Sequence, residues 1–180
     1  KIFIGHDKNN IKNASIVVYS SAIKQNNPEI VEAKKLFIPI IHRSEMLSEL
    51  MKLKKSIAIA GTHGKTTTTS LISKILDTNK MDPTIINGGI ISSLASNAKL
   101  GQGQWMVVEA DESDGSFSKL MPTVAVITNI DLEHLDFHKN EKNLENAFIN
   151  FISSIPFYGF CSVCIDHPRV QKIFSNLKNR

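Results

Sequence analysis

Hydrophobic residues along this chain gather in short runs, separated by segments whose apolar residues recur every three or four positions. The runs have the length of buried strands, and the separating segments have the period of amphipathic helices. We expect strands at residues 15–19, 37–40, 56–60, 105–109, 123–128 and 160–165. Helices are expected to begin near residues 27, 44, 65, 141 and 168. This alternation predicts an α/β fold with a doubly wound, mostly parallel sheet.

Two of the predicted helices have informative sequences. Asn27 and Pro28 are typical of an N-cap and a first helical position, and Glu29 adds an acid to the first turn. The helix predicted at residues 65–76 has an apolar face, formed by Leu71, Ile72 and Ile75.

Length and composition limit the fold and its setting. A chain of 180 residues with 42% hydrophobic residues can bury one core, or one domain and part of another. We expect a boundary near Lys54, between a small leading α/β unit and a nucleotide-binding unit.

No apolar run reaches the length of a membrane span, and no signal peptide opens the chain. The chain begins without a methionine and is expected to be a piece of something longer. Two cysteines are too few for a disulfide framework and suit a reducing cytoplasm.

The charge of the chain is mildly basic, with a formal net charge of +4. Lys52, Lys54 and Lys55 form a cluster, but no aromatic residues are interleaved with them, so we interpret the cluster as a solvated helix end. Nucleic-acid binding is therefore not expected. A slight basic excess fits small anionic ligands equally well.

The strongest chemical signal is the sequence Gly-Thr-His-Gly-Lys-Thr at residues 61–66, which follows a predicted strand and opens a predicted helix. Glycines let backbone N–H groups turn toward a phosphate, and the helix N-terminus adds partial positive charge. Lys65 would reach the terminal phosphates of a nucleotide, and the Thr66 hydroxyl would take a place on Mg²⁺. The usual P-loop has another glycine where this chain has Ile59. We predict a shortened P-loop; an ordinary strand-to-helix turn is the alternative.

Two further predicted strands end in polar residues. In doubly wound sheets, ligands gather beyond the carboxyl ends of the strands. Glu109 directly follows the apolar run at residues 105–108, and an acid at that place near a P-loop is predicted to be a Mg²⁺ ligand. For Asp111, Glu112 and Asp114, a solvated acidic turn is the alternative.

Two residue pairs resemble metal sites. His134 and His138 have the spacing of zinc ligands on a helix, but no Glu-bearing zinc motif surrounds them. Cys161 and Cys164 fall in a predicted strand, where alternation points them to opposite faces, so they cannot both ligate one ion. We expect no zinc site and interpret the cysteines as core residues.

Taken together, these motifs resemble the Mur ligase family. The resemblance rests on the P-loop segment 61–69, on the acidic segment 109–114, and on residues 128–130 followed by His134. Flanking segments agree, so that the resemblance covers essentially the whole chain: residues 20–23, 27–31, 45–51, 148–151 and 156–159. Within the family, the sequence is most similar to the branch that adds L-alanine to UDP-N-acetylmuramate.

The resemblance implies a domain arrangement. Family enzymes have a leading domain that holds the UDP-sugar, a central ATPase domain, and a trailing domain that helps to bind the amino acid. Residues 1–54 would be part of a Rossmann-like leading domain and residues 55–180 part of the central domain. The trailing domain and the glycine-rich opening that would hold the UDP diphosphate are absent from this chain.

The resemblance also implies a reaction in the cytoplasm, as a step of peptidoglycan synthesis. ATP would phosphorylate the muramoyl carboxylate of UDP-N-acetylmuramate, and the amine of L-alanine would attack the acyl phosphate. Mg²⁺ is the implied cofactor, and no nucleic acid, membrane or protein partner is expected. The implied catalytic residues are Lys65, Glu109 and His134, and the implied metal ligands are Thr66, Glu109 and His134. The implied nucleotide-binding residues are Gly61, Thr62, His63, Gly64, Lys65, Thr66, Thr67 and Asn129.

Three rival interpretations stay open. The recycling ligase that joins a tripeptide to the same UDP-sugar carries an aromatic residue where this chain has Ser113. A folylpolyglutamate-type ligase shares the style of P-loop, but such enzymes begin with the ATPase domain. The chain as it stands could also be a nucleotide-binding fragment without ligase activity; that interpretation predicts ATP binding with no amide product.

Overall fold

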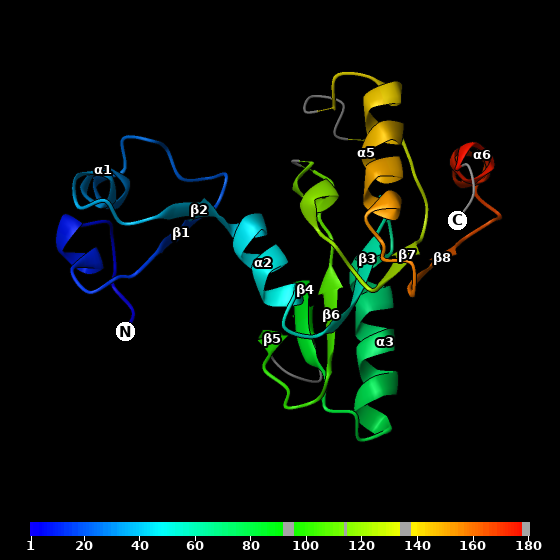
Figure 1. Ribbon diagram of the computed structural model, residues 1–180, viewed down its shortest axis with the longest axis horizontal. Helices are drawn as coiled ribbons and strands as arrows, with labels where there is room; N and C mark the ends of the chain where they lie inside the picture. The colour runs from blue at the N-terminus through cyan, green and yellow to red at the C-terminus, as the bar shows by residue number, and fades with distance from the viewer. Residues whose placement is uncertain (92–95, 114, 134–137, 178–180) are drawn as a thin grey trace. The chain divides into compact units, whose positions relative to one another are not determined.

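The computed structural model describes residues 1–91, 96–113, 115–133 and 138–177 (Figure 1). The contacts within the chain divide it into two compact units, Lys1–Leu47 and Ser48–Arg180. This division falls within helix α2 (Arg43–Met51), a few residues before the boundary expected near Lys54. Within the described ranges, no helix combines the length and the apolar character that crossing a membrane requires.

The first unit is a small α/β piece. Its strands β1 (Val17–Tyr19) and β2 (Ile40–His42) pair in parallel, which requires the crossover connection that α1 (Pro28–Lys35) provides. A short 3-10 helix, η1 (Lys8–Ile11), packs against α1. Asn27 caps α1 as predicted, because its side-chain oxygen accepts a hydrogen bond from the N–H of Glu29 at 2.9 Å.

The strand predicted at residues 37–40 lies further along the chain, at Ile40–His42. Helix α1 ends in a left-handed turn at Phe37, whose φ is 55°, and the N–H of Ile38 donates to the carbonyl of Ala33 at 2.9 Å. This six-to-one bond is the signature of a Schellman motif, which usually has glycine at the left-handed position. The apolar run of residues 37–40 is therefore partly a helix terminus, a role that its hydrophobicity does not reveal.

The second unit is built on a six-stranded sheet in the order β5-β4-β6-β3-β7-β8. Neighbouring strands are parallel except for β5, which is antiparallel to β4. The strands are β3 (Lys55–Ala60), β4 (Thr84–Ile91), β5 (Ser96–Lys99), β6 (Trp105–Glu109), β7 (Val124–Ile127) and β8 (Phe160–Val163). The helices are α3 (Lys65–Thr78), η2 (Ser116–Lys119), α5 (Glu141–Ser153) and α6 (Pro168–Asn176). The predicted α/β fold with a mostly parallel sheet is confirmed.

Strands β4 and β5 were not expected from the sequence. Strand β4 contains Asn87, Gly88 and Gly89 in its middle, a combination that is typical of a turn. Strand β5 has the sequence Ser-Asn-Ala-Lys, which has little of the β-branched or aromatic content that marks a strand. Both strands form because pairing with neighbours in the sheet overrides their weak local preference.

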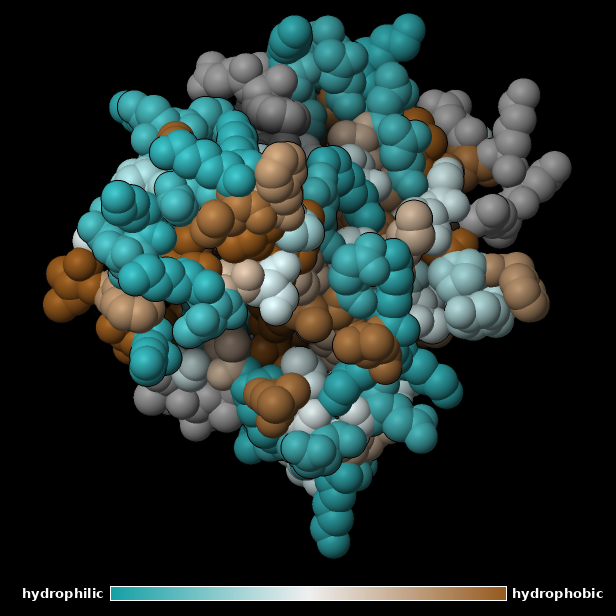
Figure 2. Space-filling model, turned by 60° about the vertical axis from the view of Figure 1, so that its left-hand side comes forward, coloured by the Kyte–Doolittle hydropathy of each residue, from teal (hydrophilic) through white to brown (hydrophobic). Residues whose placement is uncertain are grey.

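Helix α3 packs on the sheet through small polar residues rather than through its apolar face. Thr69 and Ser73 are buried, whereas Leu71 and Ile75 are 60% and 61% exposed. Small side chains at the buried positions let the helix backbone approach the strands closely. Figure 2 shows other apolar residues, in brown, exposed among hydrophilic ones.

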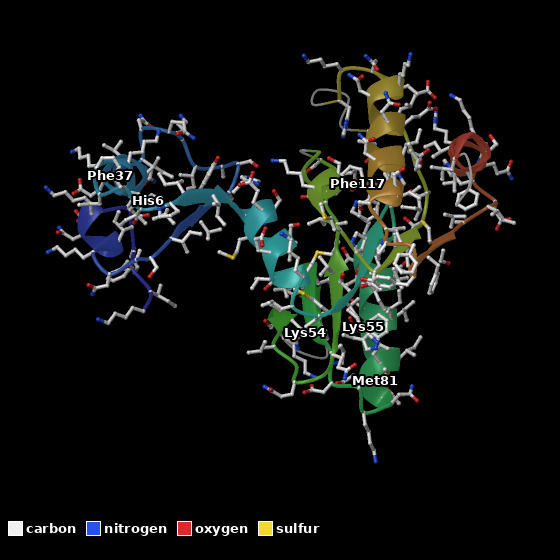
Figure 3. The ribbon with its side chains drawn as sticks, in the orientation of Figure 1. His6, Phe37, Lys54, Lys55, Met81 and Phe117 are labelled. Carbon is white, nitrogen blue, oxygen red and sulfur yellow. The ribbon has the colours of Figure 1, made fainter. Side chains whose placement is uncertain are left out.

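A buried aromatic cluster of this unit lies between η2 and α5. Phe117, labelled in Figure 3, packs against Phe148 and Phe151, with ring centroids 4.9 and 5.4 Å away, and all three residues are buried. These contacts fix the segment that follows β6, so that the acidic turn before η2 has a rigid support.

Two interpretations of side chains were wrong. Lys54, labelled in Figure 3, is not a solvated helix end: its ammonium donates to the carbonyls of Gly101 and Gly103 at 2.6 and 2.8 Å. Cys164 is exposed rather than part of the core, because β8 ends at Val163. Burial raises the pKa of the Cys161 thiol to about 12, which keeps it protonated and unreactive.

Candidate nucleotide-binding site

The order of strands in the sheet brings three polar segments to one edge. Strand β3 lies between β6 and β7 and is parallel to both. The chain leaves β3 toward one side of the sheet and later returns to β7 on the other side, which makes a topological switch point. The P-loop after β3, the acidic turn after β6 and residues 128–131 after β7 therefore meet at the carboxyl edge of the strands.

The P-loop is fastened to the segment that follows β7. Gly61 has a φ of 133°, and a Cβ there would lie 2.1 Å from the Thr128 hydroxyl oxygen and 2.8 Å from the Asn129 carbonyl oxygen. Only glycine fits this approach. The N–H of Thr62 donates to the Asn129 carbonyl at 3.1 Å, and the Thr62 hydroxyl accepts from the N–H of Asp131 at 2.8 Å.

Asn129 and His63 form a second fastening. The N–H of His63 donates to Asn129 Oδ1 at 2.8 Å, and Asn129 Nδ2 donates back to the His63 carbonyl at 2.9 Å. The His63 ring points elsewhere, with Nε2 3.4 Å from Asp131 Oδ2 and 3.6 Å from Glu133 Oε1. Both residues were predicted to contact nucleotide. The structure shows that the Asn129 amide holds the shape of the loop.

The N-terminus of α3 points its free backbone donors toward the same edge. Gly64 occupies the N-cap in a left-handed conformation, with a φ of 81°, and makes no side-chain capping bond. The first backbone bond of the helix runs from the N–H of Thr68 to the Gly64 carbonyl at 2.9 Å. The N–H groups of Lys65, Thr66 and Thr67 have no carbonyl one turn earlier in the helix, so they form an arrangement suited to an anion.

Thr66 and Glu109 lie side by side at this edge. The Thr66 hydroxyl oxygen is 3.1 and 3.0 Å from the two carboxylate oxygens of Glu109. The backbone N–H of Gly88, on β4, donates to Glu109 Oε2 at 2.8 Å. Neutral donors from two elements thus orient the carboxylate without neutralising its charge, which leaves it able to attract a cation.

Lys65 is held by its own loop and by a buried acid. Its ammonium donates to the carbonyls of Gly61 and Thr62 at 2.7 and 3.1 Å. It also lies 2.9 and 2.8 Å from Oε1 and Oε2 of Glu112. The Lys65 side chain is 14% exposed and that of Glu112 only 2%.

Glu112 is not part of a solvated acidic turn. Burial raises the pKa of its carboxyl group, and the Lys65 ammonium opposes that shift. Its backbone carbonyl lies 2.9 Å from Nε2 of the buried His138. Asp111, by contrast, is exposed and accepts a bond from the N–H of Ser113 at 3.0 Å, so the solvated interpretation holds for that residue.

Comparison with known proteins identifies the family. Residues 59–180 match the model of the Mur ligase middle domain, and residues 1–55 match that of the Mur ligase family catalytic domain. The chain belongs to the Mur ligase family.

The Mur ligase match extends to individual proteins. A UDP-N-acetylmuramate–L-alanine ligase of Phenylobacterium zucineum is 55% identical over all of this chain and 38% of its own length. The crystal structure of a UDP-N-acetylmuramate–alanine ligase from Thermotoga maritima superposes with a TM-score of 0.84, at 29% identity over 95% of this chain and 40% of that one. A UDP-N-acetylmuramate:L-alanyl-γ-D-glutamyl-meso-diaminopimelate ligase from Neisseria meningitides gives a TM-score of 0.83 at 23% identity over 97% of this chain and 60% of that one, a likeness of fold. The chain spans about 38% of the length of the curated relatives it matches.

The structure brings together most of the residues predicted for this Mur ligase site. Gly61, Thr62, Lys65, Thr66 and Glu109 converge at the carboxyl edge of the sheet. His134, the predicted second metal ligand, lies outside the described residues. Within the described ranges, no three His, Cys, Asp or Glu side chains form a cluster that could hold a metal ion.

Sequence reasoning missed Gly88. A Cβ at this position would lie 2.9 to 3.1 Å from the Glu109 carboxylate group, so a side chain there would displace that group. The only signal was the pair of adjacent glycines, Gly88 and Gly89, which usually marks a turn. A glycine pair inside a strand can instead mark a close approach.

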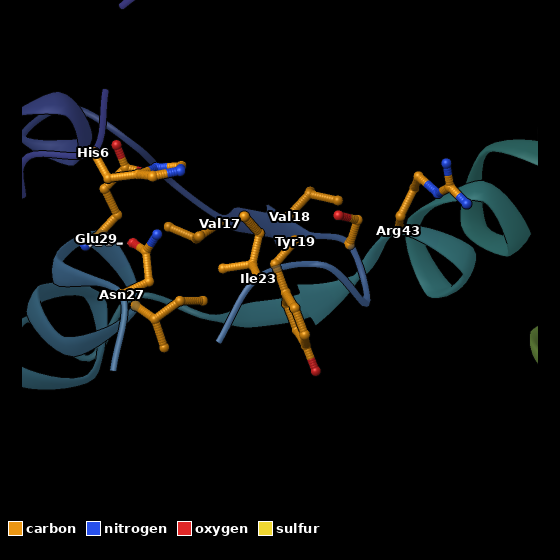
Figure 4. A pocket seen from close by; sticks show the side chains of 10 residues that line it. His6, Val17, Val18, Tyr19, Ile23, Asn27, Glu29 and Arg43 are labelled. Atoms are coloured by element: carbon orange, nitrogen blue, oxygen red, sulfur yellow. Dashed lines mark hydrogen bonds and ion pairs between the residues drawn. The ribbon is translucent and has the colours of Figure 1, made fainter. Parts of the chain in front are cut away.

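The first unit contains a pocket of its own, of about 370 Å³. Figure 4 shows His6, Asn27 and Glu29 at one end of it and Arg43 at the other. The rest of the lining comes from strand β1, from Ser20, which follows it, and from Ile23 and Ile30. The pocket thus combines hydrogen-bond donors, hydrogen-bond acceptors and a guanidinium group.

Proposed function

We propose that this chain is the part of an ATP-dependent ligase that contains the phosphoryl-transfer site, and that the ligase joins L-alanine to UDP-N-acetylmuramate in peptidoglycan synthesis. The observation that carries the proposal is the meeting of Lys65, Thr66 and Glu109 at the N-terminus of α3. The specific substrates rest on the relative from Phenylobacterium zucineum, which is named for them and matches every part of the chain. Since ATP and UDP-linked precursors are cytoplasmic compounds, the proposed reaction belongs in the cytoplasm.

The residues at the edge of the sheet suit the phosphates of ATP. Phosphoryl transfer asks a protein mainly to position its reactants and to neutralise charge that develops on the phosphate oxygens. The Lys65 ammonium would face the β- and γ-phosphates, and the N–H groups of the first turn of α3 would receive the remaining oxygens. The fastening of the P-loop to residues 128–131 keeps these donors in place before the nucleotide arrives.

Thr66 and Glu109 fit a magnesium ion. A hydroxyl and a carboxylate are the hard oxygen donors that Mg²⁺ takes up beside nucleotide phosphates. Their oxygens are about 3 Å apart, and only neutral groups of the protein touch the carboxylate among the contacts described. When bound, Mg²⁺ would supply positive charge to the phosphate oxygens. Gly88 would keep Glu109 turned toward Thr66.

The pocket of the first unit is our proposed location for part of the UDP-sugar. Arg43 and Asn27 offer donors to a polar, negatively charged ligand, and Val17 and Val18 offer an apolar wall. Pockets that combine a few polar groups with apolar walls are the usual form of small-molecule sites.

The recycling ligase remains the second candidate. Its relative from Neisseria meningitides has nearly the same TM-score, but at 23% identity that likeness shows only the fold. Ser113 favours the alanine-adding branch, since the recycling branch carries an aromatic residue there.

A chimera tests the proposal. The matching segment of the Phenylobacterium zucineum relative, 38% of its length, is replaced by these 180 residues, and ADP release is measured with UDP-N-acetylmuramate and L-alanine. We expect release that depends on both substrates and that Lys65→Ala abolishes. The relative supplies the remaining segments, so the assay asks whether this chain supports turnover. A folded chimera that binds ATP without releasing ADP would instead support a nucleotide-binding module.

A further inference from the structure

The ammonium group of Lys65 has all of its donors in use within the protein. A lysine ammonium has three N–H donors. The carbonyls of Gly61 and Thr62 accept two of them, and the carboxylate of Glu112 lies within 2.9 Å to accept the third. For Lys65 to donate to a phosphate, at least one of these three interactions has to be released.

Of the three acceptors, Glu112 is the strongest and the most firmly placed. A hydrogen bond between two charged groups is roughly twice as strong as one between neutral groups. The Glu112 side chain is 2% exposed, and the Glu112 backbone carbonyl lies within hydrogen-bond distance of the His138 ring nitrogen Nε2. The backbone carbonyl of His138 in turn accepts a hydrogen bond from Asn143 Nδ2 at 2.8 Å. The acid is thus fixed to the N-terminal turn of α5, whereas Lys65 has a flexible four-carbon stem. Lys65 is the member of the pair that can move.

The pair also explains how a carboxylate is tolerated at this depth. A buried charge is costly unless it is paired and hydrogen-bonded. The Lys65 ammonium supplies a charge of opposite sign 2.8 Å away. Nucleotide phosphates and Glu112 therefore compete for the same cation, the Lys65 ammonium. The phosphates would approach a site in which the buried Glu112 carboxylate carries a negative charge.

We propose that Glu112 is an internal counter-ion of the P-loop, which holds Lys65 against its own loop and with which the phosphates of a nucleotide compete. The inference rests on the proposed function, because it assumes that Lys65 binds phosphate. It makes Glu112 a positioning residue that sets how tightly the loop takes up nucleotide. Neutralising this acid removes the competitor while leaving an amide of the same shape.

The test is calorimetric titration of Mg·ATP into the wild-type chain and into Glu112→Gln. We expect Glu112→Gln to lower the Kd about fivefold, the difference between a charged and a neutral acceptor. A purely structural role for Glu112 predicts the opposite direction, since a damaged site binds more weakly. Asp111→Asn is the matched control: it removes the same charge one residue away, keeps the acceptor for the N–H of Ser113, and is expected to change the Kd less than twofold.

The outcomes separate the two ideas. Binding by the wild type that Glu112→Gln leaves unchanged or weakens overturns the counter-ion role and leaves the proposed function intact. Absence of binding in both proteins overturns the proposed function, and this inference with it. Thermal unfolding checks that each variant is folded. If Glu112→Gln does not fold, Glu112→Asp replaces it: its shorter side chain withdraws the charge from Lys65, and a Kd about twofold lower is expected, whereas an unchanged or higher Kd contradicts the proposal.

Discussion

Two carboxylates of the same turn have opposite surroundings. Glu109, at the end of β6, is oriented by the Thr66 hydroxyl and the Gly88 N–H. Glu112, three residues later, is buried against the Lys65 ammonium. Glu109 therefore presents a negative charge that neutral donors orient, whereas the positive charge of Lys65 is already paired with an acid of the protein.

The difference teaches how a short segment can serve both a cation and an anion. Neutral donors fix a carboxylate in direction and preserve its charge for an incoming metal ion. An ammonium near a buried acid is fixed in the same way but is partly neutralised, so an anion has to compete for it. The three-residue spacing of Glu109 and Glu112 places one acid beside Thr66 and the other beside Lys65.

The largest expected effect follows from removing the cation. Lys65→Ala takes away the ammonium that faces the buried Glu112, and we expect the free energy of unfolding to fall by about 3 kcal/mol at neutral pH. Because burial raises the pKa of the Glu112 carboxyl group above its ordinary value, the folded state binds a proton more readily than the unfolded chain. Stability is then lost as the pH rises through the raised pKa. Denaturant unfolding at pH 5 and pH 7.5 should show a larger deficit at pH 7.5.

A second substitution controls for lost packing. Adding Glu112→Gln to Lys65→Ala removes the buried charge, and most of the lost stability should return. Glu112→Gln alone should cost less than Lys65→Ala, because the long lysine side chain can turn its ammonium toward water. Equal deficits in the single and double variants would show that the ion pair is not the cause.

The next effect concerns the metal side of the edge. Glu109→Gln keeps the shape of the side chain but removes its charge, and we expect the Mg²⁺ concentration needed for half-maximal nucleotide binding to rise about tenfold, equivalent to about 1.4 kcal/mol. Binding of ADP without Mg²⁺ should stay the same or tighten slightly. An unchanged Mg²⁺ titration would remove Glu109 from the metal site.

The smallest effect comes from the strand that supports Glu109. In Gly88→Ala the new methyl group would press on the carboxylate, and we expect about a threefold rise in the Mg²⁺ requirement, or about 0.7 kcal/mol. The wild type is the comparison, because a Cβ at the neighbouring Gly89 would lie 3.2 Å from the methyl group of Thr66, the other proposed Mg²⁺ ligand. Mg²⁺ titrations of Gly88→Ala and the wild type should differ; identical curves would mean that Gly88 has no special role.

The sequence predicted the β3–loop–α3 unit well, because strand, glycines, lysine and hydroxyl occur there in a fixed local order. It also predicted β6 with its bounds at Trp105 and Glu109. Contacts between segments that are distant along the chain could not be predicted from the sequence. The fastening of His63 to Asn129 and the burial of Glu112 depend on which strands become neighbours, and no local pattern encodes that.

The sequence failed where local preference and tertiary setting disagree. Gly88 lies in a strand although its neighbours suggest a turn, and Phe37 takes a left-handed conformation in which glycine is usual. In α3, hydrophobicity pointed to Leu71 and Ile75, but the small residues Thr69 and Ser73 face the sheet. Close packing between backbones favours small side chains there over apolar ones.

The most direct test of the central claim is calorimetric titration of Mg·ATP into this chain and into the double variant Lys65→Ala/Glu112→Gln. The double variant is chosen because its stability should lie near that of the wild type. If the edge of β3, β6 and β7 is a phosphate site, the wild type binds Mg·ATP with a stoichiometry of about one and the folded variant does not. Equal binding by both proteins would contradict the assignment of Lys65 and of the P-loop.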